Sequence, residues 1–82
     1  PALQALLEPH IERPWAEISP IERGILLIAA CELRDHLGTP WRVIINEAIE
    51  LTKSYGGTDG HKFVNGVLDK LAPALRPDET RS

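Results

Sequence analysis

Proline and glycine residues divide this chain into helix-length segments, and this division limits its possible folds more than any other feature. Between the breaks, apolar residues recur about every three to four positions, which is the period of an amphipathic helix. No segment has the strict polar–apolar alternation of a half-buried strand. The first segment, residues 2–12, predicts the tail of a helix that Pro14 stops; its apolar residues are Leu3, Leu6, Leu7 and Ile11.

The second segment carries the clearest start signal. Ser19-Pro20-Ile21-Glu22 has the form of a capping box, in which Ser19 accepts from the amide of Glu22 and Glu22 reaches back, with proline at the first helical position. We expect the helix to run to about Leu37 and to end at Gly38, since glycine tolerates the left-handed conformation of many helix stops. Its middle, ILLIAAC, is apolar almost all round, so this helix should be central and buried.

Two further segments follow, each after a start signal. Thr39-Pro40 precedes a helix that Gly56-Gly57 should end, and one face of it consists of Trp41, Ile44, Ile45, Ala48, Ile49, Thr52 and Tyr55. Thr58-Asp59 offers an N-cap for the last helix, whose apolar stripe consists of Phe63, Val64, Val67, Leu68, Leu71 and Leu75. Pro73 and Pro77 should close that helix.

These segments together predict an all-α protein, a small helical bundle with three complete helices and the tail of a preceding helix. Residues 1–76 should form the domain, and residues 77–82 a polar, mobile tail. A length of 82 residues allows one small domain. The sequence opens on Pro1 without an entry cap, from which we expect a truncated or processed product.

Charge and cysteine content narrow the classes of function. The formal net charge is −3, so a nucleic acid would have to meet a local basic patch rather than a general positive field. Cys31 is the only cysteine, which excludes a disulfide within the chain and favours a reducing compartment. The longest apolar run, ILLIAAC, is far shorter than the ~20 residues of a membrane span, so we expect no membrane association.

The stretch YGGTDGHKFVNG, residues 55–66, invites comparison with known ligand sites. It lacks the glycine spacing, the Ser or Thr after lysine and the preceding strand of a phosphate-binding loop. The candidate metal ligands lack the close spacing of a structural zinc site; they are Cys31, Glu32, His36, Asp59 and His61. Cys31 lies in the most apolar segment, where burial suppresses thiol reactivity. We therefore expect no cofactor, no metal and no catalytic residue.

The run PWRVIINEAIELTKSYGGTDGHKFVNGVLDKLAPALRP resembles the carboxy-terminal half of the NusB family, most characteristically in INEAIELTKSYG and DGHKFVNGVLDK. SPIERGILLIAACEL resembles the preceding helix of that family, which typically has an aromatic residue in place of Cys31. The resemblance spans essentially residues 2–77 and about half of the usual family length. The other half would carry the first helices and a basic amino-terminal segment.

The resemblance implies a small, all-α, cytoplasmic bacterial protein without catalytic activity. Family members pair with the ribosomal protein NusE, and the pair binds the boxA element of single-stranded nascent RNA. With other Nus factors it keeps RNA polymerase resistant to termination, chiefly on ribosomal RNA operons. The alternative is a non-catalytic helical interaction module, such as the NusB-like accessory domain of a ribosomal RNA methyltransferase. The short polar carboxy-terminus favours the free-standing factor.

By the same resemblance, the junction of the last two helices matches the RNA-facing surface of the family. Aromatic faces stack on unpaired bases, cations neutralise phosphates, and a helix start adds free amides. The expected RNA-binding residues are Lys53, Tyr55, Asp59, Lys62 and Phe63. Simpler alternatives stay open: the two aromatic residues could be core, Asp59 only a helix cap, and the lysines ordinary solvated charges.

The expected partner-binding residues lie at the start of the second helix and are Glu22, Arg23, Leu26 and Leu27. Glu22 matches a family position at the NusE-binding surface. The alternatives are the capping box for Glu22 and packing within the chain for the others.

Two consequences are expected for these 82 residues alone. With two lysines and a salt slope of about −0.7 per phosphate, binding of boxA-type RNA should be weak and shallow in its salt dependence. The missing helices should leave apolar surface on the central helix, so the chain should self-associate, for example by exchanging helices in a dimer.

Overall fold

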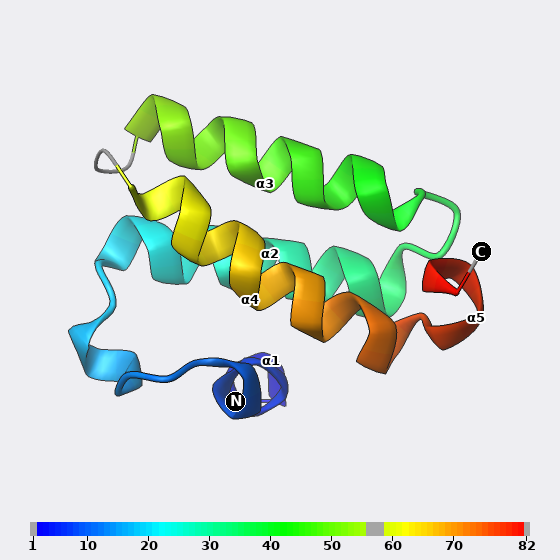
Figure 1. The fold of residues 1–82 in the computed structure, drawn as a ribbon, viewed down its shortest axis with the longest axis horizontal. Helices are drawn as coiled ribbons and strands as arrows, with labels where there is room; N and C mark the ends of the chain where they lie inside the picture. Colours follow the sequence, from blue (N-terminus) through cyan, green and yellow to red (C-terminus); the bar gives the residue numbers. More distant parts are fainter. Residues whose placement is uncertain (1, 56–58, 82) are drawn as a thin grey trace.

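The computed structural model describes residues 2–55 and 59–81, and every regular element in these ranges is a helix (Figure 1). Three long helices dominate: α2 (Pro20–Asp35), α3 (Trp41–Tyr55) and α4 (Gly60–Leu75). The shorter elements are α1 (Ala2–Leu7), the 3-10 helices η1 (Glu8–His10) and η2 (Trp15–Glu17), and α5 (Pro77–Thr80). The predicted all-α bundle of three complete helices and the tail of a preceding helix is confirmed.

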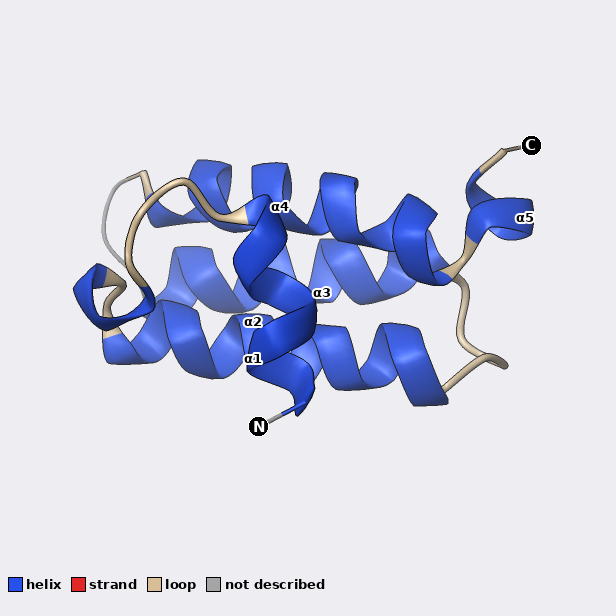
Figure 2. Cartoon of the chain, turned by 90° about the horizontal axis from the view of Figure 1, so that it is seen from below, coloured by secondary structure: helices blue, strands red, loops and turns tan. Residues whose placement is uncertain are grey.

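The three long helices lie side by side and alternate in direction along the chain (Figure 1). As a result, α2 begins at the end of the bundle at which α3 ends and α4 begins. The opposite end holds the α2–α3 connection, the last turn of α4 and α5. Helix α1 runs crosswise to the bundle and packs on α2 and α4 (Figure 2).

The core lies between the three long helices and α1. Because burying one large aliphatic side chain contributes about 1.5–3 kcal/mol before entropy costs, this cluster supplies most of the stabilisation. Its largest apolar members, all below 2% exposure, are Leu7, Leu26, Leu33, Ile44, Leu68, Leu71 and Val64.

The start of α2 follows its sequence signal closely. Ser19 Oγ accepts a hydrogen bond from the amide of Glu22 at 3.2 Å, which is the first half of the predicted capping box. The hydroxyl of Ser19 also donates to Glu22 Oε2 at 2.9 Å, so the carboxylate of Glu22 reaches back to the side chain of Ser19. The predicted cap residue and the predicted first residue, Pro20, are both confirmed.

Two helix ends differ from those predicted. The first helix ends at Leu7 and continues as η1, well before Pro14, because Pro9 lacks the amide proton that a further turn would need. Helix α2 ends at Asp35, where the amide of His36 bonds the carbonyl of Glu32 at 2.9 Å. Gly38 is therefore not its stop, and no glycine in the described ranges has a positive φ.

Pro73 also departs from the prediction, since it lies inside α4 rather than closing it. It is exposed and close to the end of the helix at Leu75, so its missing amide removes one hydrogen bond from the last turns only. The buried neighbours Leu71 and Ala72 hold this part of α4 against the core.

Arg76 ties the end of α4 to the end of α2. Its Nε donates to the carbonyl of Leu33 at 2.9 Å, and its Nη2 donates to the carbonyls of Glu32 and His36 at 3.0 and 2.7 Å. The last carbonyls of a helix lack partners of their own, and a guanidinium can serve several at once. Arg76 is consequently only 4% exposed, which is unusual for an arginine.

Helix α5 adds a second connection at this end. Glu79 accepts from Arg76 Nη1 at 3.1 Å and from the backbone amide of Trp41, the first residue of α3, at 2.8 Å. The hydroxyl of Thr80 donates to the carbonyl of Arg76 at 2.9 Å. The segment expected to be a polar tail thus contains one helical turn, and its mobility and the domain boundary at residue 76 stay predictions.

Candidate nucleic-acid interface

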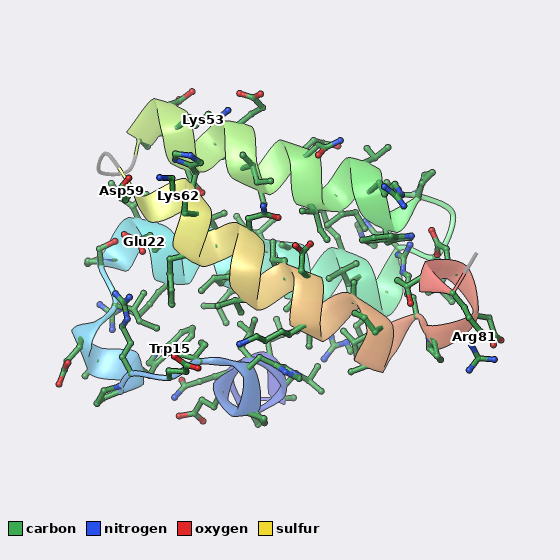
Figure 3. All side chains as sticks on the ribbon, in the orientation of Figure 1. Trp15, Glu22, Lys53, Asp59, Lys62 and Arg81 are labelled. Carbon is green, nitrogen blue, oxygen red and sulfur yellow. The ribbon has the colours of Figure 1, made fainter. Side chains whose placement is uncertain are left out.

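The residues expected to bind RNA gather where α3 ends and α4 begins, and we name Lys53, Tyr55, Asp59, Lys62 and Phe63 the α3–α4 corner. Figure 3 shows Lys53, Asp59 and Lys62 at this end of the bundle, with Glu22 of α2 at the same end. The predicted helix stop at Gly56-Gly57 and the cap residue Thr58 lie outside the described residues.

Tyr55 is the last residue of α3, and its side chain is 68% exposed. The alternative that Tyr55 belongs to the core is therefore wrong. Lys53 belongs to the same last turn and is also exposed. An exposed ring can stack on a base, and an exposed cation at the same helix end can neutralise a phosphate of the strand.

Asp59 occupies the N-cap position of α4, but its side chain makes no capping hydrogen bond. Its carboxylate instead lies 3.6 Å from Lys62 Nζ, and the two side chains are 77% and 74% exposed. Water screens such a pair, so it contributes little to stability. The effect of Asp59 is therefore on the charge around Lys62 rather than on the start of the helix.

Phe63 lies partly in the core and partly at the surface, the two environments that its sequence position allows. It is half-buried and packs against the core cluster. The guanidinium carbon of Arg13 lies over the ring, 4.3 Å from its centroid, which is a cation–π contact. A base could reach this face of Phe63 only by displacing Arg13.

A cleft beside Phe63 contains basic residues that the sequence reasoning missed. Lys62, Gly66 and Lys70 recur every fourth residue, so helical spacing alone could have placed both lysines on one face of α4. No signal in the sequence indicates that residues 10–13 fold back against α4. The cleft has a volume of about 180 Å³ and is lined by His10, Glu12, Arg13, Lys62, Phe63, Gly66, Val67 and Lys70.

The residues expected to contact a protein partner divide between core and surface. Leu26 is fully buried within the chain, and Leu27 is half-buried against the same cluster. Glu22 and Arg23 are half-buried at the start of α2. Glu22 therefore supports the cap of α2 and still presents part of its carboxylate to solvent.

The apolar side chains that α2 exposes are different ones. Ile21 and Ile28 are 46% and 56% exposed, and Leu51 of α3 is 40% exposed. Ile28 and Leu51 border the same shallow groove between α2 and α3. Large exposed aliphatic side chains on adjacent helices are typical of protein contact surfaces.

The residues considered for metal binding and catalysis do not converge. Within the described ranges, no three His, Cys, Asp or Glu side chains are placed to hold a metal ion. The half-buried thiol of Cys31 lies 3.6 Å from Asp35 Oδ2. A hydrogen bond from Arg34, aided by its charge, holds the pKa of Asp35 below its ordinary value. This group lies at the end of α2 remote from the corner.

Comparison with known proteins places the chain in one family. The sequence model of the NusB family matches residues 1–73. In the described part of the chain, no helix combines the length and the apolar character that a bilayer crossing requires.

Curated relatives match most of the chain. Transcription antitermination protein NusB from Aromatoleum aromaticum is 68% identical over 77 residues, which are 94% of this chain and 53% of that protein. The protein of the same name from Dechloromonas aromatica is 66% identical over 70 residues, 85% of this chain and 43% of that protein. The one from Paraburkholderia xenovorans is 57% identical over 81 residues, 99% of this chain and 56% of that protein. The chain thus spans about half the length of these relatives, and it belongs to the NusB family.

Proposed function

We propose that this chain is the carboxy-terminal part of a transcription antitermination factor that binds boxA-type single-stranded RNA together with the ribosomal protein NusE. The observation that carries the proposal is that Tyr55 is exposed at the end of the bundle that also presents the exposed Lys53 and Lys62, on a chain whose net charge is −3. A solvent-exposed ring and two cations at one helix junction have no evident role in the core. They suit an unpaired ribonucleotide strand.

Each residue of the corner has a role in this proposal. Tyr55 stacks on a base, and Lys53 and Lys62 neutralise phosphates. Asp59 competes with RNA phosphate for Lys62 and can accept a hydrogen bond from a base amino group. Phe63 supports the site indirectly, by holding Arg13, because the guanidinium of Arg13 covers its ring face.

The start of α2 supports binding of the protein partner. Glu22 and Arg23 offer opposite charges there. Leu27, further along the same helix, is partly buried against the core. Leu26 is buried in the core and so acts by shaping α2 rather than by contact. The exposed Ile21 extends this surface with an apolar side chain.

The wider setting follows from the family. We infer a non-catalytic cytoplasmic factor that needs no cofactor and that acts with other Nus factors and RNA polymerase on ribosomal RNA operons. The chain alone should bind RNA weakly, because few cations oppose its net negative charge. It should also self-associate through its exposed apolar surface.

Fluorescence anisotropy with labelled boxA-type RNA and NusE present tests the proposal. Tyr55→Ala should weaken binding about fivefold or more, since stacking one base is worth about 1–3 kcal/mol. Lys62→Ala should weaken binding and make the salt slope shallower by about 0.7. Arg81→Ala is the matched control, because it removes one charge at the opposite end of the bundle (Figure 3). Unchanged binding by both corner variants would exclude the proposed site.

A further inference from the structure

We propose that the cleft between α4 and residues 10–13 receives one unpaired nucleotide of the bound RNA, with the guanidinium of Arg13 as its stacking surface. This inference rests on the proposed function and adds a second binding position beside the α3–α4 corner. We name this cleft the Arg13 cleft; its charged and aromatic residues are His10, Glu12, Arg13, Lys62, Phe63 and Lys70.

The Arg13 cleft is locally basic although the chain is acidic. Three permanent cations, Arg13, Lys62 and Lys70, line the cleft with one carboxylate, Glu12, and the carboxylate of Asp59 lies 3.6 Å from Lys62 Nζ. The local balance is thus +1, whereas the whole chain carries −3. Low-dielectric walls with one dominant sign of charge concentrate the field in a cleft. A phosphate therefore meets attraction here that the average charge of the chain would not predict.

The planar guanidinium of Arg13 is held in place by the ring of Phe63. Its guanidinium lies 4.3 Å from the Phe63 centroid, and Phe63 is itself held by the core. Within the described ranges, Arg13 donates no hydrogen bond and forms no ion pair, so its five N–H donors are available to a ligand. Nucleobases stack on arginine planes as well as on aromatic rings. The outer face of Arg13 thus offers a nucleobase a stacking surface, whereas the ring face of Phe63 is covered.

The size of the cleft limits the ligand. Its volume of about 180 Å³ is below the range of roughly 300–1,000 Å³ typical of small-molecule sites. A single base or phosphate suits it better than a whole cofactor. Lys62 belongs both to the cleft and to the corner, so one RNA strand can contact both.

An abasic scan of the RNA isolates the stacking interaction. One nucleotide at a time of a boxA-type RNA loses its base, and each RNA is titrated by anisotropy against the unsubstituted chain and Arg13→Lys, with NusE present. Arg13→Lys keeps the charge but lacks the planar group, so intact RNA should bind about fivefold or more weakly with an unchanged salt slope. At the position whose base stacks on Arg13, the abasic RNA should bind the unsubstituted chain and Arg13→Lys with equal affinity, because the stacking contact is already lost.

Two charge variants accompany the scan. Lys70→Ala should make the salt slope shallower by about 0.7, because the cleft loses one phosphate contact. Arg81→Ala, remote from the cleft, should leave the abasic profile unchanged (Figure 3).

The possible results separate the two proposals. If Lys62→Ala and Tyr55→Ala weaken binding but Arg13→Lys binds every RNA as the unsubstituted chain does, the cleft assignment is overturned and the corner stands. If the unsubstituted chain binds no RNA with NusE present, both fall. If polyglutamate of equal charge displaces the RNA and is equally sensitive to Arg13→Lys, the cleft holds an acidic protein segment instead.

Discussion

The carboxylate of Glu22 on α2 lies 3.2 Å from the position that a Cβ of residue 60 would occupy, and Gly60 leaves that position empty. Cγ2 of Thr52 on α3 lies 3.3 Å from the same point. The start of α4 can therefore touch both other long helices. This contact places Glu22, proposed to bind a protein partner, beside the helix start proposed to bind RNA, so the two surfaces share one end of the bundle.

Gly60→Ala should lower the free energy of unfolding by about 1 kcal/mol, since overpacking of about 1–3 kcal/mol outweighs a helix-propensity gain below about 1. Glu22 can move aside, but Thr52 cannot: it is fully buried and its hydroxyl donates to the carbonyl of Ala48 at 2.7 Å. Urea denaturation followed by circular dichroism measures the change.

Gly66→Ala is the matched control on the same helix. An added methyl group there meets no atom within 4 Å, so the substitution should raise stability by about 0.5–1 kcal/mol. Equal effects at the two positions would show that the contact with Glu22 and Thr52 does not limit residue 60.

Arg76→Leu should cost about 3 kcal/mol, a large part of the stability of a domain this small. The loss leaves buried carbonyls at the end of α2, such as that of Leu33, without their donor. Arg76→Lys should recover only part, because an ammonium lacks the planar fork of donors. Arg81→Leu, at an exposed position, should stay within about 0.5 kcal/mol. Thermal unfolding ranks the three, and Arg76→Lys matching the parent would contradict the role of the fork.

The two functions assigned to Glu22 can be separated. Ser19→Ala should destabilise by about 1 kcal/mol, because the amide of Glu22 loses its cap. Glu22→Gln keeps an acceptor for the hydroxyl of Ser19, so stability should change by less than about 0.5 kcal/mol. It removes the charge, however, and should weaken binding of NusE in a calorimetric titration. If Glu22→Gln destabilises as much as Ser19→Ala and binds NusE normally, Glu22 is only a capping residue.

Asp59→Asn should tighten RNA binding about two- to fivefold at low salt, since an exposed charge interaction is worth up to about 1 kcal/mol. The carboxylate that neutralises Lys62 at 3.6 Å is removed, and so is its repulsion of phosphate. The gain should shrink as salt rises. Asp69→Asn removes the same charge from an exposed position further along α4 and serves as the control. A loss of affinity in Asp59→Asn would show that the carboxylate accepts a hydrogen bond from the RNA.

Local signals predicted the existence of the helices, and tertiary contacts set their ends. Ser19 caps α2 through atoms three residues apart, which a sequence pattern can reveal. The end of α2 depends on Arg76, whose donors reach the carbonyl of Leu33 from 43 positions further along the chain. No local pattern contains that contact, and the sequence predicts a later stop, at Gly38, than the observed end at Asp35.

The candidate site shows the same division. Helical spacing placed Tyr55 on an apolar stripe, but a stripe does not indicate where the neighbouring helix stops covering it, and Tyr55 is 68% exposed. The family resemblance and the side-chain chemistry group Lys53, Asp59 and Lys62, which the fold brings to one end of the bundle (Figure 3). Arg13 was missed because its contact with Phe63 depends on how residues 10–13 turn back.

The exposed aliphatic side chains of α2 and α3 lead to the last prediction, which concerns self-association. Ile28 and Leu51, 56% and 40% exposed, border one groove between these helices. Pairing two such grooves would remove apolar area from water at about 25 cal/mol per Å². Sedimentation velocity should therefore show a concentration-dependent dimer for this chain.

Ile28→Lys and Leu51→Lys should each shift the chain toward monomer, because an ammonium in the centre of an apolar contact must be desolvated. Leu37→Lys provides the matched control: Leu37 is 69% exposed but lies in the connection between α2 and α3, away from the groove. Its variant should dimerise as the parent does, since it changes exposed apolar area without touching the groove. A parent chain that sediments as a monomer at every concentration, or three lysine variants with the same behaviour, would rule out this groove as the contact.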